Sequence, residues 1–140
     1  MFNNLSPKIT WNHNKYMNVY VGHSSSINFE DRVYRPLEKS KISDRCNLVF
    51  PHKDDKQIFD SKRFLREECD LFVAEVSEAS TGLGIELGWA DMFEVPVLAV
   101  YREKSEYSNS IKAVADEIKA YSGTDELINI IENKLREGDN

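Results

Sequence analysis

The chain has 140 residues, a formal net charge of −6 at pH 7, 41% hydrophobic residues and 30% charged residues. This length predicts one domain with a sizeable core. The negative charge argues against a nucleic-acid backbone as the main partner, because proteins that bind it usually present a basic face. We expect neither a membrane span nor a signal peptide, since no apolar run is long enough. Two cysteines without metal-type spacing, Cys46 and Cys69, favour a reducing compartment, so we expect a cytoplasmic protein.

The first segment of the chain, residues 1–16, shows no clear hydrophobic period, and we expect a poorly ordered extension there. Residues 17–140 are expected to form the domain. Its first element is a buried strand at 17–22, where an apolar run ends at a glycine. A polar loop follows it, and a helix is predicted over 29–39, which Pro36 ends or kinks.

The rest of the chain alternates between short apolar runs and helix-like segments. Strands are predicted at 46–50, 71–76, 96–101 and 118–121, and helices at 56–68, 85–93 and from 124 onward. Such apolar runs suit strands that are buried on both faces, and their alternation with helices predicts a parallel sheet. We therefore expect an α/β protein with a doubly wound five-stranded parallel sheet, in a flavodoxin- or Rossmann-like three-layer α/β/α arrangement.

Chemistry is expected where the strand at 71–76 gives way to the next helix, because ligands bind at the carboxyl ends of the strands in an open parallel sheet. Gly82 and Gly84 let a ligand approach the backbone, and the N–H groups of a helix N-terminus favour an anion. The Ser80 hydroxyl belongs to the same loop. Glu86 is expected in the first helical turn, where the helix dipole stabilises its ionised form. Taken alone, these features also suit a purely structural role.

The whole string from Ala74 to Gly88 favours a functional role over a purely structural one. It reads A-E-V-S-x-x-S-x-G-x-G-x-E-L-G. Together with the apolar strand before it and the Pro96–Leu98 segment after it, it resembles the nucleoside 2-deoxyribosyltransferase superfamily. Within that superfamily it is most similar to the 2′-deoxynucleoside 5′-phosphate N-hydrolases. The resemblance is strong over residues 70–102 and weaker over 17–52. It implies hydrolysis or base transfer at the N-glycosidic bond of a nucleoside or a (deoxy)nucleoside 5′-monophosphate.

The resemblance also implies roles for single residues. Glu86 would be the nucleophile that attacks C1′ of the sugar, and Tyr20 would orient it. The positions that match substrate-binding residues of the family are Gly22, His23, Ser24, His52, Ser80, Gly82, Gly84 and Ser108. An exposed loop explains His52 equally well, and helix capping explains Ser108 or its fallback Ser110.

Two positions depart from the family's pattern. The family loop Gly-Ser-Ile-Arg-Gly reads Gly-His-Ser-Ser-Ser here, so the arginine is missing. His23 is the candidate substitute donor to a phosphate, and a surface histidine without such a role is the alternative. An aspartate that the family carries eight residues before Asp70 is replaced by Lys62, which leaves Asp60 as the nearby candidate acid. This second departure keeps open the alternative of a catalytically inactive nucleotide-binding module. A third class, the phosphoribohydrolases, lacks support because its usual Pro-Gly-Gly-x-Gly-Thr loop is missing.

The implied reaction needs no metal and no organic cofactor. The expected partner is a small nucleoside or nucleotide, and neither nucleic acid nor a membrane. A homodimer or higher homo-oligomer is implied, because the helix that carries Trp89, Met92 and Phe93 often packs at a subunit interface in this superfamily. The base, the choice between ribose and 2-deoxyribose, and the choice between hydrolase and transferase stay open.

Overall fold

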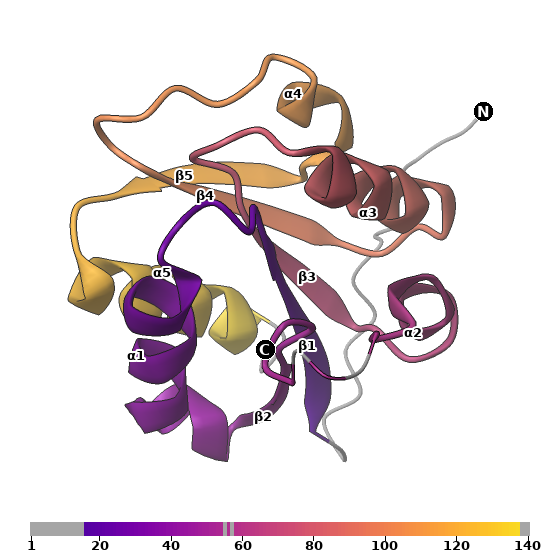
Figure 1. The fold of residues 1–140 in the computed structure, drawn as a ribbon. Helices are drawn as coiled ribbons and strands as arrows, with labels where there is room; N and C mark the ends of the chain where they lie inside the picture. The colour runs from indigo at the N-terminus through magenta and orange to yellow at the C-terminus, as the bar shows by residue number, and fades with distance from the viewer. Residues whose placement is uncertain (1–15, 55, 57, 138–140) are drawn as a thin grey trace.

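The computed structural model describes residues 16–54, 56 and 58–137, and these residues form one α/β unit (Figure 1). The predicted extension at 1–16 falls outside the described residues, apart from Tyr16. The elements in chain order are β1 (Met17–His23), η1 (Glu30–Tyr34), α1 (Arg35–Lys39), η2 (Lys41–Asp44), β2 (Cys46–Val49), α2 (Ser61–Glu67), β3 (Leu71–Glu75), α3 (Thr81–Met92), β4 (Val97–Arg102), α4 (Ile111–Val114), β5 (Glu117–Tyr121) and α5 (Thr124–Glu137).

The strands form a five-stranded parallel sheet in the order β2-β1-β3-β4-β5, which confirms the predicted doubly wound fold. The chain winds outward from β1 in both directions, so the strand order reverses between β1 and β3. Tyr20 lies opposite Phe72 in this central pair, and Gly22 lies opposite Ala74. The crevice at such a reversal is where open α/β sheets bind their ligands.

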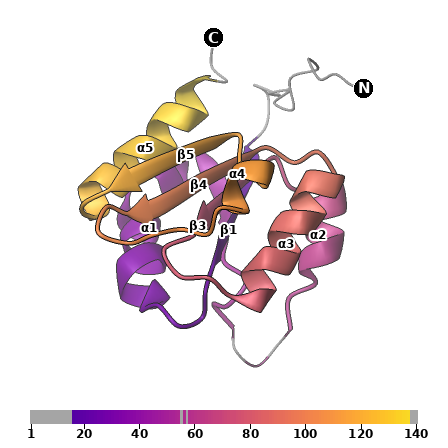
Figure 2. The same ribbon diagram turned by 90° about the horizontal axis from the view of Figure 1, so that it is seen from above.

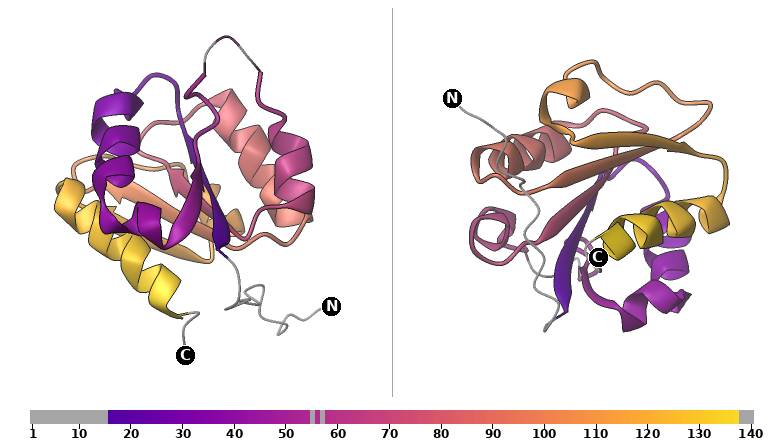
Figure 3. Two further views of the ribbon diagram at one scale, coloured as in Figure 1. Left: turned by 90° about the horizontal axis from the view of Figure 1, so that it is seen from below. Right: turned by 180° about the vertical axis from the view of Figure 1, so that it is seen from behind.

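Side chains alternate across the sheet and divide the core into two layers. Val19, Val21 and Val73 belong to the layer that packs under α1 and α5, whereas Tyr20 and Phe72 belong to the layer under α2 and α3. Figure 2 shows the two pairs of helices on opposite sides of the sheet. In Figure 3, α2 and α3 lie side by side. The alternation therefore places Tyr20 beneath the two helices that carry the candidate site.

The predicted helix at 29–39 is confirmed as helical, but its first half is a π-helix. The Arg35 N–H bonds the carbonyl of Glu30, five residues back, before the α-helical turns of α1 begin. Pro36, in the first turn of α1, has no N–H with which to continue a regular α-helical ladder. A wider turn just before the proline accommodates the missing donor without ending the helix.

Two predicted helix starts were wrong. The helix predicted at 85–93 begins at Thr81, because the Ser80 hydroxyl caps it by accepting from the Leu83 N–H at 3.2 Å. The helix predicted at 56–68 begins only at Ser61 and ends at Glu67. Asp60 caps it, since its Oδ1 accepts from the Arg63 N–H at 3.2 Å.

Over the described residues, no helix combines the length and the apolar character needed to cross a membrane. The same residues contain no group of three or more His, Cys, Asp or Glu side chains that could hold a metal ion.

Candidate active site

Glu86 lies on α3 and faces the sheet, where it meets Tyr20 from β1. The Tyr20 hydroxyl donates to Glu86 Oε2 at 2.5 Å and also lies 2.6 Å from Ser61 Oγ, at the start of α2. Tyr20 has one hydroxyl hydrogen and directs it to the carboxylate, so the serine hydroxyl is the donor in the second contact. The result is a relay of three hydroxyl and carboxyl groups, Ser61 to Tyr20 to Glu86, contributed by three different elements.

The tyrosine of this relay is held rigidly. Tyr20 is fully buried, and its ring lies edge-on to Phe72, with centroids 5.0 Å apart, and 5.8 Å from Phe64. Burial raises the pKa of Tyr20 above its ordinary value, and the charge of Glu86 adds to the effect. The phenol therefore stays protonated and serves as a fixed hydrogen-bond donor to the carboxylate.

The sequence analysis placed Glu86 in a first helical turn, and this was wrong. Because α3 begins at Thr81, Glu86 lies in the second turn, beyond the short range of the helix dipole. Burial raises its pKa above the ordinary value, whereas the hydrogen bond from Tyr20, the nearby Ser61 hydroxyl and the nearby His52 act in the opposite direction. The charge of this carboxylate is therefore supported by neighbouring side chains and not by the helix terminus.

A cavity of about 350 Å³ opens beside Glu86. Its lining consists of Pro51, His52, Asp54, Ile58, Phe59, Ser61 and Glu86. Ile58 is completely exposed and Phe59 is 37% exposed, so this wall offers apolar surface to a ligand. His52 and Glu86, both predicted as site residues, line the same cavity although they lie far apart in the sequence.

His23, at the end of β1, is 3% exposed and uses both ring nitrogens within the protein. Its Nδ1 lies 2.9 Å from the carbonyl of Ser24, which can only accept, so Nδ1 carries the proton. Its Nε2 then accepts from the Tyr34 hydroxyl at 2.7 Å. Burial lowers the pKa of His23 to about 4, so the ring is neutral near pH 7. These bonds argue against the predicted role of His23 as a donor to phosphate.

The ring of His23 instead belongs to an aromatic cluster that supports the cavity wall. It stacks on Phe29 with centroids 4.3 Å apart and lies 5.2 Å from the ring of His52. Tyr34 ties this cluster together, because its hydroxyl also accepts from the His52 N–H at 3.1 Å. The cluster thus fixes the backbone from which His52 reaches the cavity.

The other predicted binding residues lie at or near the carboxyl edge of the sheet, but outside the lining of this cavity. A Cβ on Gly22 would lie 2.6 Å from the Phe72 ring, so this position needs glycine for packing. Gly82 and Gly84 lie in the first turn of α3 with open space where a Cβ would stand. Ser24 is 2% exposed, and its Oγ lies 2.8 Å from that of Ser26.

The last predicted binding residue, Ser108, is exposed in the segment before α4. Its Oγ lies 2.8 Å from Ser110 Oγ, so the serine and its fallback form one pair. Neither serine lines the cavity beside Glu86.

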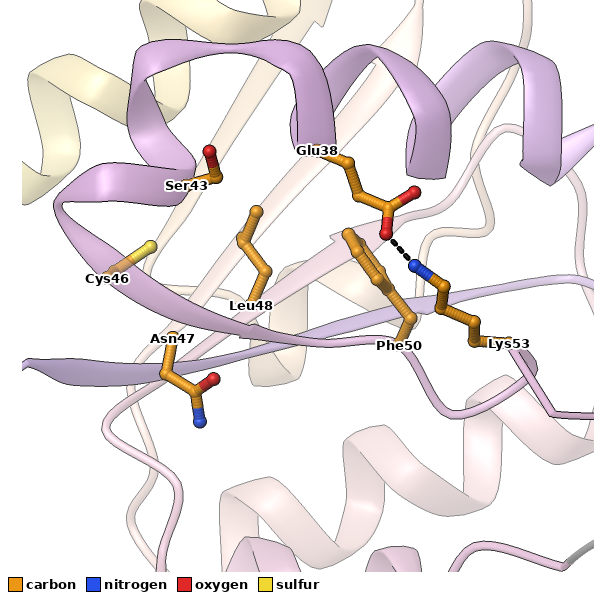
Figure 4. A pocket seen from close by; sticks show the side chains of 7 residues that line it. All are labelled: Glu38, Ser43, Cys46, Asn47, Leu48, Phe50 and Lys53. Carbon is orange, nitrogen blue, oxygen red and sulfur yellow. Dashed lines mark ion pairs between the residues drawn. The ribbon is translucent and has the colours of Figure 1, made fainter.

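A second cavity, of about 370 Å³, lies beside the edge strand β2 and is separate from Glu86 (Figure 4). Its charged groups, Glu38 and Lys53, form an ion pair with each other. Burial raises the pKa of the Cys46 thiol to about 11, so this cysteine is protonated and a poor nucleophile near pH 7. In the second cavity the carboxylate is paired with a lysine and the thiol is protonated, whereas the first cavity presents the Glu86 carboxylate.

Comparison with known proteins shows the family and the fold of this chain. No family model matches the chain. Over 111 residues the chain is 33% identical to a protein of Thermofilum pendens (strain DSM 2475 / Hrk 5) named "Putative 2'-deoxynucleoside 5'-phosphate N-hydrolase 1", and the match covers 76% of this chain and 77% of that protein. This chain belongs to the 2′-deoxynucleoside 5′-phosphate N-hydrolase family. A protein of Syntrophotalea carbinolica (strain DSM 2380 / NBRC 103641 / GraBd1) with the same name is 39% identical over 54 residues, which are 39% of this chain and 38% of that protein.

Solved structures show the same fold for this N-hydrolase family member. The structure of Clostridium botulinum CMP N-glycosidase, BcmB, superposes with a TM-score of 0.58 at 19% identity, over 82% of this chain and 98% of the other. A conserved protein from Enterococcus faecalis V583 superposes with a TM-score of 0.53 at 15% identity, over 86% and 99% of the two chains. At these identities the likeness concerns the arrangement of sheet and helices.

The structure brings two polar residues that the sequence analysis missed, Asp54 and Ser61, into the cavity beside Glu86. Ser61 directly precedes Lys62, the position that stands out in the family pattern, so the adjacent hydroxyl was a signal that could have been read. Asp54 follows His52 by two residues, in a loop whose path no periodicity predicts. Lys62 itself places its Nζ 5.8 Å from the centre of the Trp89 ring. Asp60, the predicted acid, caps α2 and does not line the cavity.

Proposed function

We propose that this protein cleaves the N-glycosidic bond of a nucleoside or a (deoxy)nucleoside 5′-monophosphate, with Glu86 as the nucleophile. The observation that carries the proposal is the hydrogen bond of 2.5 Å from Tyr20 to Glu86, on the carboxylate that lines the cavity. The names of the relatives, N-hydrolase and N-glycosidase, support the same type of reaction.

In the proposed first step, one Glu86 oxygen attacks C1′ of the sugar while the C1′–N bond breaks and the base departs. In the second step, water or another base releases the sugar from Glu86, which is the logic of retaining glycosidases. Tyr20 keeps one carboxylate oxygen engaged, and this leaves the other to face the sugar. The apolar side chains of Ile58 and Phe59 offer a surface on which a planar base can pack.

The phosphate of a nucleotide is assigned to the open first turn of α3. Gly82 and Gly84 leave open space beside this turn, Ser80 caps it, and the N-terminus of a helix favours an anion. Ser24 and Gly22 lie at the end of β1, the strand next to β3, and Ser108 is the contribution expected from a neighbouring subunit. A homodimer in the cytoplasm completes the proposal; the exposed apolar side chains of Ile85 and Met92 on α3, 48% and 77% exposed, support the dimer. The two cysteines, both free, support a reducing compartment.

The second candidate is a catalytically inactive nucleotide-binding module, and Lys62 in place of the family aspartate is the observation that favours it. One assay separates the two functions. The protein is incubated with a panel of ribo- and deoxyribonucleosides and their 5′-monophosphates, and free base is measured by chromatography. The enzyme predicts release of base that disappears in Glu86→Gln. Tight binding of a nucleotide without release of base from any compound would establish the binding module instead.

A further inference from the structure

Cleavage of an N-glycosidic bond calls for a proton donor as well as a nucleophile. A nucleobase departs with an electron pair on nitrogen, and protonating that nitrogen makes it a better leaving group. The beginning of α2 does not offer such an acid to the cavity. Asp60 caps the helix and does not line the cavity, and Lys62 lies over the Trp89 ring.

Two carboxyl groups line the cavity, and they come from different elements of the fold. Glu86 belongs to α3, and Asp54 belongs to the loop between β2 and α2. Asp54 Oδ1 accepts from the Lys56 N–H at 3.0 Å, a local turn that fixes the direction of the carboxyl group. The same loop carries Ile58 and Phe59, the apolar side chains assigned to the base. Asp54 therefore belongs to the loop on which the leaving base is expected to lie, in the same cavity as the nucleophile.

We propose that Asp54 is the general acid that protonates the departing base. This inference rests on the function proposed above. As the bond from a Glu86 oxygen to C1′ forms and the C1′–N bond breaks, the electron pair of the broken bond passes to the base nitrogen, which takes the proton of the Asp54 carboxyl group. Water then attacks C1′ and gives its proton to the Asp54 carboxylate, and Glu86 leaves with the electron pair of the ester bond. The net reaction consumes one water and yields the free base and the sugar.

Two substrates test this role, because an acid is needed only when the leaving group is poor. The first is whichever nucleoside or nucleotide the wild-type protein cleaves. The second is the 4-nitrophenyl glycoside of the same sugar, whose leaving group departs without protonation. For Asp54→Asn we expect kcat on the natural substrate to fall by about 100-fold or more, as for the loss of a general acid. On the 4-nitrophenyl glycoside we expect little change.

The matched control is Asp60→Asn, a carboxylate-to-amide change six residues away that keeps a capping side chain on α2. It should leave the ratio of kcat on the natural substrate to kcat on the 4-nitrophenyl glycoside unchanged.

The outcomes are distinguishable from a failure of the proposed function. If the wild-type protein releases no base from any substrate, the proposed function fails. If the wild type is active and Asp54→Asn cleaves the natural substrate at the wild-type rate, the function stands and the assignment of Asp54 is refuted. An equal loss on both substrates refutes it as well, because a residue that only shapes the cavity does not discriminate between leaving groups.

Discussion

The hydrogen bond from Tyr20 to Glu86 should set the acid limb of the pH profile. Glu86 must be ionised to attack, so kcat/KM falls as the pH drops through its pKa, which burial already raises. Tyr20→Phe removes a bond that favours the ionised form, so the pKa of Glu86 rises further and the fall begins at a higher pH. A hydrogen bond to a charged group contributes about 1.5–3 kcal/mol, and about 1.4 kcal/mol changes an equilibrium constant tenfold. On the acid limb we therefore expect roughly 10- to 100-fold less active enzyme than in the wild type.

The assay is base release measured as kcat/KM from pH 4 to 9, with unfolding followed under the same conditions. The matched control is Tyr121→Phe, because the Tyr121 hydroxyl also donates to a buried carboxylate, that of Glu75, in another part of the protein. The control should lose stability without moving the acid limb. The reasoning is refuted if Tyr20→Phe, folded and measurably active, keeps the wild-type acid limb, or if Tyr121→Phe moves that limb to the same extent.

Further predictions concern the surroundings of the relay. Gly22→Ala should lower the free energy of unfolding in urea by about 1–3 kcal/mol, because its Cβ would meet the Phe72 ring at 2.6 Å; Gly84→Ala, which meets open space, should not be destabilised. Asp60→Ala should cost about 1 kcal/mol as a lost helix cap while kcat stays near wild type, and a large fall in kcat in stably folded protein would restore Asp60 as the acid. Ser61→Ala should move the acid limb upward, but less than loss of the tyrosine hydroxyl does, since Ser61 has the smaller effect on the pKa of Glu86; an unmoved limb would remove the serine from the relay.

The sheet could be predicted from the sequence because parallel strands that are buried on both faces appear as continuous apolar runs. Leu71–Glu75 and Val97–Arg102 were found within one or two residues on this ground alone. The helix starts were harder to predict. Glycine is a poor helix former, so the two glycines in the first turn of α3 argued against a helix there. The Ser80 cap outweighs that preference in the structure, and the helix begins at Thr81.

The candidate site was predictable only in part. Glu86, Tyr20 and His52 came from the resemblance to a family. The structure places Glu86 and His52 in the lining of one cavity, with the buried Tyr20 hydrogen-bonded to Glu86. The orientation of Ser61 depends on where α2 begins, which follows from the Asp60 cap and not from the periodicity of the charged segment. Asp54 depends on the path of a loop between β2 and α2. The path of such a loop leaves no periodic signal in the chain.

The central claim, a covalent bond between Glu86 and the sugar, is tested most directly by trapping. The protein is incubated with a 2′-fluoro analogue of its substrate, whose electron-withdrawing fluorine slows release of the intermediate, and the peptides are analysed by mass spectrometry. The account predicts one sugar (or sugar phosphate) attached to the peptide that contains Glu86, with one base released per subunit. Release of the base without an adduct, or an adduct on a peptide from elsewhere in the chain, would contradict it.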